Sequence, residues 1–215
     1  FRKDYEFSRT FVAAEDILKE EKIILVCEGL DTLADIYING QKAGSADNMH
    51  RTWKLDVKGF LHSGENQIRI VFRSVFKYIE AYEYEENKEI HYVPCGGMKG
   101  NQLIRKAHCM FGWDWGAHLP DAGLFRPVNL LGVEEARIDS VYITQEHLTD
   151  KVLLHLDVEI EELEKTDQAW SYHVKVTAPD GGVVADSRDP RTVTIEHPQR
   201  WWPNGYGEQN LYQVE

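Results

Sequence analysis

Alternating apolar and polar residues run through most of this chain and constrain its fold more than any other feature. The longest example spans residues 152–160, where an apolar side chain occupies every second position. Shorter examples span residues 68–72 and 172–178. Successive side chains of a strand point to opposite faces, so this pattern is typical of half-buried strands in antiparallel sheets. We therefore expect an all-β protein.

Three segments depart from this alternation. Asn39-Gly40 follows an apolar run and favours the type I′ turn of a β-hairpin. Residues 75–86 carry apolar side chains at helical spacing, which predicts a short helix. Residues 87–110 show no sustained period and contain glycines and a proline, so they are expected to form a long irregular loop. Long loops within compact β domains are often functional.

The domain organisation follows from a change in the pattern near residues 132–135. Strands on both sides of this point, with no helix between them, indicate two consecutive β-sandwiches. The expected domains are residues 1–132 and 133–215. Because the chain opens directly before a strand, we expect the first domain to lack an N-terminal strand. A sandwich of the expected type needs most of residues 134–215 and a little more, so we expect the second domain to be truncated at its end.

Composition restricts the partners. The chain has 24 Lys and Arg against 36 Asp and Glu, a net charge of -12. An acidic chain without a basic stripe is a poor match for nucleic acid or an anionic membrane surface, so neither is an expected partner. No apolar run reaches the roughly 18 residues that a membrane span needs.

The cysteines argue against a disulfide framework. Cys27, Cys95 and Cys109 are an odd number, which favours reduced thiols and a cytoplasmic location. Cys27 lies in an apolar run and is expected to be a core thiol. No Cys or His pair has the spacing of a zinc site, so we expect no metal and no cofactor.

Residues 111–116, Phe-Gly-Trp-Asp-Trp-Gly, carry the strongest chemical signal. They place the carboxylate of Asp114 between the indoles of Trp113 and Trp115. A sugar subsite needs such groups, because an indole covers the C–H face of a pyranose and a carboxylate accepts hydrogen bonds from its hydroxyls. The competing interpretation is structural: tryptophans are usually buried, and backbone N–H groups or a nearby arginine would then satisfy the aspartate.

As a set, the motifs resemble glycoside hydrolase family 2. The segments that resemble its jelly-roll, galactose-binding-like domain are residues 29–32, 34–40, 48–51, 56–57 and 64–66. The segments that resemble its β-mannosidase branch are residues 105–107, 111–116 and 123–128. Residues 201–207 are similar to the end of the family's second domain. The resemblance thus implies a jelly-roll β-sandwich followed by an immunoglobulin-like β-sandwich.

The family also implies an activity, that of a retaining β-mannosidase that removes terminal, non-reducing β-D-mannose. Its two catalytic glutamates lie on a later (β/α)8 barrel, a fold of about 250 residues of which this sequence shows no trace. We therefore assign no catalytic residue and expect the chain alone to be inactive. The implied partners are a β-mannoside oligosaccharide and the downstream barrel of the same polypeptide.

Matching the family's Trp-Asp loop to this sequence identifies the candidate substrate-binding residues. Asp114 would accept hydrogen bonds from sugar hydroxyls, and Trp113 would supply an apolar wall. Arg105 is a further candidate that either contacts the ligand or pairs with Asp114. Trp115 is also a candidate, although alternation along an extended segment favours a buried supporting role for it. Residues 117–118, Ala-His, depart from the proline and basic residue common in related sequences.

Two other functions remain open. One is another family 2 hydrolase, such as a β-galactosidase or β-glucuronidase, against which residues 111–116 argue. The other is a stand-alone carbohydrate-binding module, because jelly rolls serve as lectins as well as enzyme domains.

Overall fold

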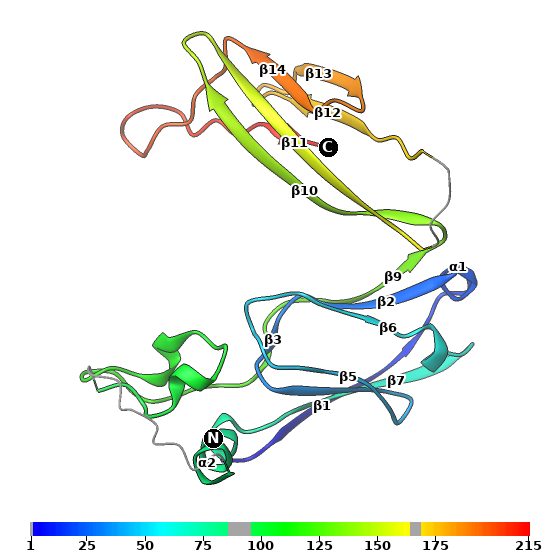
Figure 1. Cartoon of the computed structure of the whole chain (residues 1–215), viewed down its shortest axis with the longest axis vertical. Coiled ribbons are helices and arrows are strands. Elements are labelled where there is room, and N and C mark those ends of the chain that lie inside the picture. Colours follow the sequence, from blue (N-terminus) through cyan, green and yellow to red (C-terminus); the bar gives the residue numbers. More distant parts are fainter. Residues whose placement is uncertain (1, 86–95, 164–168) are drawn as a thin grey trace. The chain divides into compact units, whose positions relative to one another are not determined.

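The computed structural model describes residues 2–85, 96–163 and 169–215 (Figure 1). The chain separates into two compact units, Phe1–Glu134 and Glu135–Glu215, which we call the first and second domains. Each described domain consists mainly of antiparallel strands. The predicted all-β class is confirmed.

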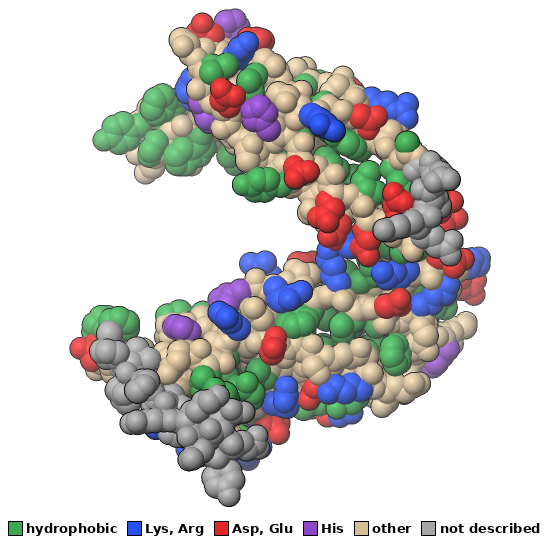
Figure 2. All heavy atoms as spheres, in the orientation of Figure 1, with side chains coloured by type: hydrophobic (Ala, Val, Ile, Leu, Met, Phe, Trp, Pro, Cys, Tyr) green, Lys and Arg blue, Asp and Glu red, His purple; other side chains and the backbone are tan. Residues whose placement is uncertain are grey.

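The surface is mixed in charge on the face that Figure 2 shows, where acidic and basic side chains are interspersed. Within the described ranges, no helix is long and apolar enough to cross a lipid bilayer.

The first domain is built from two antiparallel sheets, with strand orders β1-β7-β4-β5 and β6-β2-β9, and from the pair β3-β8. Its strands are β1 (Tyr5–Val12), β2 (Lys22–Cys27), β3 (Leu30–Asp31), β4 (Ala34–Ile38), β5 (Gln41–Ala46), β6 (Trp53–Asp56), β7 (Glu65–Phe72), β8 (Gly123–Leu124) and β9 (Val128–Val133). Its helices are α1 (Glu15–Lys19) and α2 (Val75–Glu85), with the 3-10 turns η1 (Lys58–Phe60), η2 (Asn101–Leu103) and η3 (His108–Phe111).

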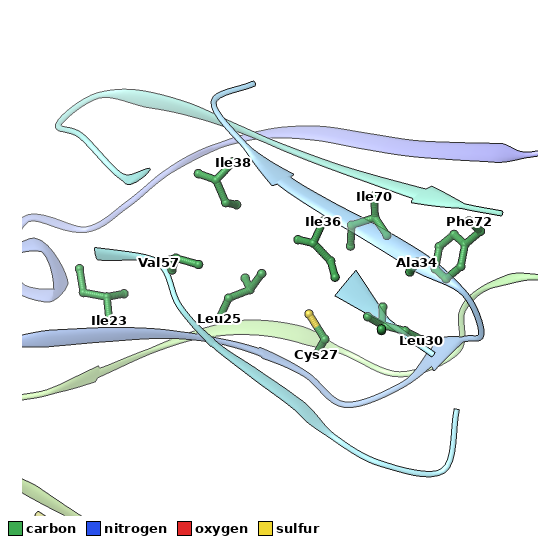
Figure 3. Close-up of a cluster of buried hydrophobic side chains, with 11 residues drawn as sticks. Ile23, Leu25, Cys27, Leu30, Ala34, Ile36, Ile38, Val57, Ile70 and Phe72 are labelled. Carbon is green, nitrogen blue, oxygen red and sulfur yellow. The ribbon is translucent and has the colours of Figure 1, made fainter. Parts of the chain in front are cut away.

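The core of the first domain lies between its two sheets (Figure 3). Ile23 and Leu25 project from β2 toward the opposite sheet, which contributes Ile36 of β4 and Ile70 and Phe72 of β7 to the same cluster. All five side chains are buried. The strand predicted at residues 68–72 is therefore confirmed as part of β7, with alternate side chains in the core.

The predicted hairpin is also confirmed. Asn39 and Gly40 join β4 to β5 with φ angles of 49° and 79°, both positive as a type I′ turn requires. The side-chain amide of Asn39 donates to the backbone oxygen of Phe60 and to Asn66 Oδ1, each at 2.8 Å. Its Oδ1 accepts from the backbone N–H of Gln67 at 2.8 Å. The asparagine thus shapes the turn and also ties it to β7.

Cys27 is a core thiol, as predicted, and burial raises its pKa to about 12. Cys109 is exposed on η3, and Cys95 lies outside the described residues. Because the thiolate is the reactive form, alkylation with iodoacetamide at pH 8 should modify Cys109 and leave Cys27 intact until the chain is unfolded. Mass spectrometry of the peptides measures this difference. Equal modification of the two cysteines in the folded chain would contradict the buried placement of Cys27.

The second domain pairs two sheets with strand orders β10-β11-β14 and β13-β12-β15. Its strands are β10 (Ala136–His147), β11 (Lys151–Glu162), β12 (His173–Thr177), β13 (Val183–Arg188), β14 (Thr192–Glu196) and β15 (Gln213–Val214). The strands predicted at residues 152–160 and 172–178 are confirmed as β11 and β12. Their buried alternate side chains form a core with those of β14, namely Val152, Leu154, Leu156, Val174, Val176, Val193 and Ile195.

Candidate functional site

The site is carried by the loop that follows α2. This helix confirms the one predicted at residues 75–86. Part of the predicted loop, residues 87–95, lies outside the described residues; the remainder is irregular, as expected, and contains only η2 and part of η3. The described part of the loop rests on a small buried cluster in the first domain, formed by Leu33, Val75, Ile79, Ile104 and Phe111.

Phe111 packs in this cluster and connects it to the Trp-Asp-Trp segment. Its ring is fully buried, and its backbone oxygen accepts from the N–H of Met98 at 3.0 Å. The next residue, Gly112, has a φ of 83°, a conformation that favours glycine. The chain leaves η3 at this glycine and turns again where the N–H of Gly116 donates to the oxygen of Trp113 at 3.3 Å. The segment is thus a tight turn that follows directly after the buried Phe111.

This turn leaves the three central side chains exposed. Trp113 is 45% exposed and Trp115 82%, and Asp114 between them is exposed as well. The ring centroids of the two indoles lie 5.4 Å apart at an interplanar angle of 47°. The expectation of a buried Trp115 is therefore wrong, as is the interpretation of the pair as core aromatics. Successive side chains point to opposite sides only along an extended strand, whereas this segment is a turn.

Two glycines allow the loop to close on itself. A Cβ on Gly96 would lie 2.7 Å from the Cα of Asp114, and one on Gly112 would lie 1.9 Å from Cδ2 of His118. The Nε2 atom of His118 is 2.8 Å from the backbone oxygen of Gly96. His118, at the departure from the family pattern, thus links the segment after the turn to the irregular loop at Gly96 before it.

Arg105 does not pair with Asp114 in the described part of the structure. Its side chain is exposed, and its backbone oxygen accepts from the N–H of Met49 at 3.0 Å. The structure therefore brings Trp113, Asp114 and Trp115 together and joins Arg105 to a different segment through the backbone. Of the two alternatives for Arg105, the ion pair with Asp114 is not formed.

A buried lysine that sequence reasoning missed ties the loop to the sandwich. Lys106 is buried, and its ammonium group forms an ion pair with the carboxylate of Asp31, at the end of β3. The same group donates to the backbone oxygen of Asp121 at 2.9 Å. The other oxygen of Asp31 accepts from the hydroxyl of Thr32. Lysine and aspartate are normally exposed, so the sequence carried no signal that this pair is buried.

The exposed side chains of this turn offer groups that can contact a ligand. An exposed carboxylate accepts hydrogen bonds from hydroxyl groups, and exposed indoles cover apolar faces. Across the described ranges, no group of three or more His, Cys, Asp or Glu side chains is placed to hold a metal ion. The arrangement suits an uncharged, hydroxyl-rich ligand.

Comparison with known families identifies the family of both domains. Residues 1–126 match the family described as glycosyl hydrolase 2 galactose-binding domain-like, and residues 136–215 match glycosyl hydrolases family 2. The chain belongs to glycosyl hydrolase family 2. Its first domain is the family's galactose-binding-like jelly roll, and its second is the immunoglobulin-like sandwich.

Within the family, the chain is similar to proteins named β-mannosidase. It is 29% identical to β-mannosidase B of Aspergillus flavus over 96% of this chain and 25% of that protein. It is 30% identical to a probable β-mannosidase of Caenorhabditis elegans over 98% of this chain and 26% of that protein. The crystal structure of a β-D-mannosidase from Dictyoglomus thermophilum superposes with a TM-score of 0.84 at 31% identity, covering 99% of this chain and 27% of that one. The chain thus spans about a quarter of the length of these relatives.

Proposed function

We propose that this chain forms the first two domains of a retaining β-mannosidase that removes terminal, non-reducing β-D-mannose from oligosaccharides. In this proposal the Trp-Asp-Trp turn lines the sugar subsite of a (β/α)8 catalytic barrel located elsewhere in the same polypeptide. The main observation in support of this proposal is that Asp114 is exposed between two exposed indoles, on a turn that follows the buried Phe111. The similarity to proteins named β-mannosidase supports the choice of substrate.

Each candidate residue has a distinct role in this proposal. Asp114 accepts hydrogen bonds from mannose hydroxyls, and Trp113 packs against the C–H face of the ring. Trp115, tilted against Trp113, widens the apolar wall, and Arg105 contributes a donor at the edge of the site. Asp114 recognises the sugar and does not cleave the glycosidic bond. The chain by itself is therefore inactive.

Replacing Asp114 by alanine in the full-length gene product tests the role of the carboxylate. A charge-assisted hydrogen bond contributes about 1.5–3 kcal/mol, so kcat/KM for p-nitrophenyl β-mannoside should fall by about 10- to 150-fold. Because Asp114 is exposed, the circular dichroism spectrum and the thermal unfolding midpoint should be unchanged.

Asp157→Ala is the matched control, because it removes an exposed carboxylate from β11 of the second domain. It should leave the kinetics at the wild-type level. Wild-type kinetics for Asp114→Ala would assign the turn a purely structural role.

The two alternative functions are separated by the choice of ligand. A preference of the full-length product for the β-galactoside or β-glucuronide over the β-mannoside would overturn the assignment to β-mannosidase. Calorimetry on the 215-residue chain tests the stand-alone module. Tight mannose binding by this chain alone would favour a stand-alone carbohydrate-binding module. It would argue against a chain that supplies only one side of a sugar site completed by the barrel.

A further inference from the structure

The second domain contains an apolar groove of about 560 Å³. Its floor includes Val152 and Leu154 of β11 and Ile195 of β14, which also belong to the core of the domain. Its rim includes Trp201, Trp202 and Leu211. These three residues lie on residues 197–212, the segment between β14 and β15, which we call the aromatic loop. The groove therefore runs from an exposed rim to the interior of the sandwich.

The rim exposes large apolar side chains. Trp201 is 51% exposed, Trp202 48% and Leu211 75%. In Figure 2, hydrophobic side chains gather on the loop that projects from the second domain beyond β14. Contiguous apolar patches of this kind, rather than isolated exposed side chains, mark interaction surfaces.

The aromatic loop is held in shape by its own hydrogen bonds. The N–H of Trp202 donates to the oxygen of Glu208, and the N–H of Tyr206 to the oxygen of Pro203, both at 3.0 Å. The guanidinium of Arg200 donates to the backbone oxygen of Leu148 at 3.1 Å and so ties the loop to the end of the β10-β11 hairpin. The apolar side chains are thus presented on a preorganised surface, which reduces the entropy lost on docking.

The groove favours an apolar protein surface over a sugar. Its aliphatic floor offers no hydrogen bonds to hydroxyl groups. Two of its polar side chains are engaged within the loop: the Asn210 amide donates to the oxygen of Arg200 at 3.0 Å, and the Tyr212 hydroxyl accepts from the N–H of Gln199 at 2.9 Å. Burial of hydroxyls without partners is costly. Among the described residues, no acidic side chain lines the groove, so it offers no carboxylate to a cationic partner.

We infer that this groove is the surface through which the second domain packs against the part of the parent polypeptide that lies outside these 215 residues. The inference rests on the proposed function, which assigns a catalytic barrel to that part. The relatives extend to about four times the length matched by this chain. Interfaces between domains of one polypeptide commonly bury about 600–1,500 Å², a size to which the aromatic rim and the groove floor contribute together.

Hydroxyl-radical footprinting tests the inference by comparing the 215-residue chain with the full-length product. Labelling of Trp201, Trp202 and Leu211 should fall by about fivefold or more in the full-length product, because these half-exposed side chains become buried. Labelling of Tyr142, an exposed side chain of β10 that does not line the groove, serves as the internal reference. The variant Leu211→Asp should restore the labelling of the two tryptophans. Val183→Asp, at an exposed position on β13, should not.

Equal labelling of the rim in both proteins would overturn the inference. Protection of the isolated chain that grows with its concentration would instead assign the groove to a second copy. Protection by added manno-oligosaccharides would assign it to a sugar. The result is independent of substrate preference, so a full-length product that prefers a β-galactoside would refute the proposed substrate without changing the labelling.

Discussion

Replacing Lys106 by methionine is expected to lower the free energy of unfolding of the first domain by about 3–5 kcal/mol. Methionine fills a similar volume, so the loss comes from charge rather than from a cavity. The substitution leaves the carboxylate of Asp31 buried without its cation. It also removes the ammonium group that donates to the backbone oxygen of Asp121 at 2.9 Å. Urea denaturation of the 215-residue chain, followed by circular dichroism, measures the change.

Lys77→Met is the matched control. Lys77 forms an ion pair with Asp4 at 3.3 Å on the surface, where both side chains are about half exposed. Exposed pairs contribute about 1 kcal/mol or less. The double variant Lys106→Met with Asp31→Leu should recover part of the loss, because it leaves no unpaired buried charge. A loss for Lys106→Met no larger than that for Lys77→Met would show that the buried pair does not hold the loop.

The strands were predictable because each has one buried and one solvated face. Alternation in β7, β11 and β12 follows directly from this difference, since side chains at i and i+2 share an environment. The Asn39-Gly40 turn was predictable because few residues adopt positive φ at two successive positions. By contrast, α1 (Glu15–Lys19) has five residues, too few to show a helical period, and the sequence did not predict it.

The site was predictable in its residue types but not in its geometry. The exposure of Trp115 depends on the turn that Gly112 starts, and local sequence does not determine where that turn points. The burial of Lys106 depends on Asp31, 75 positions earlier in the chain, which packs against it only once the sandwich has formed. Long-range pairs of this kind leave no periodic signal. Here such a pair, Lys106 with Asp31, ties the loop that carries the Trp-Asp-Trp turn to the sandwich.

Replacing Phe111 by alanine is expected to destabilise the first domain by about 3–5 kcal/mol and to disorder the turn that presents Asp114. Phe111 is fully buried among Leu33, Ile79 and the other apolar side chains of the cluster beneath the loop. Removing its ring leaves a cavity in this cluster, two residues before the Trp113 that begins the exposed turn. Urea denaturation measures the loss of stability, and kcat/KM of the full-length product on p-nitrophenyl β-mannoside measures the effect on recognition.

Two variants separate packing from the loss of an aromatic ring. Phe111→Leu retains most of the buried volume and should cost less than about 1.5 kcal/mol, with activity largely retained. Phe125→Ala removes a half-exposed ring near β8 and should cost about 1 kcal/mol. If the turn recognises the sugar because it is fixed at Phe111, kcat/KM should fall in Phe111→Ala at least as far as in Asp114→Ala. Wild-type kinetics in a destabilised Phe111→Ala enzyme would mean that contacts outside the first domain hold Asp114 in place.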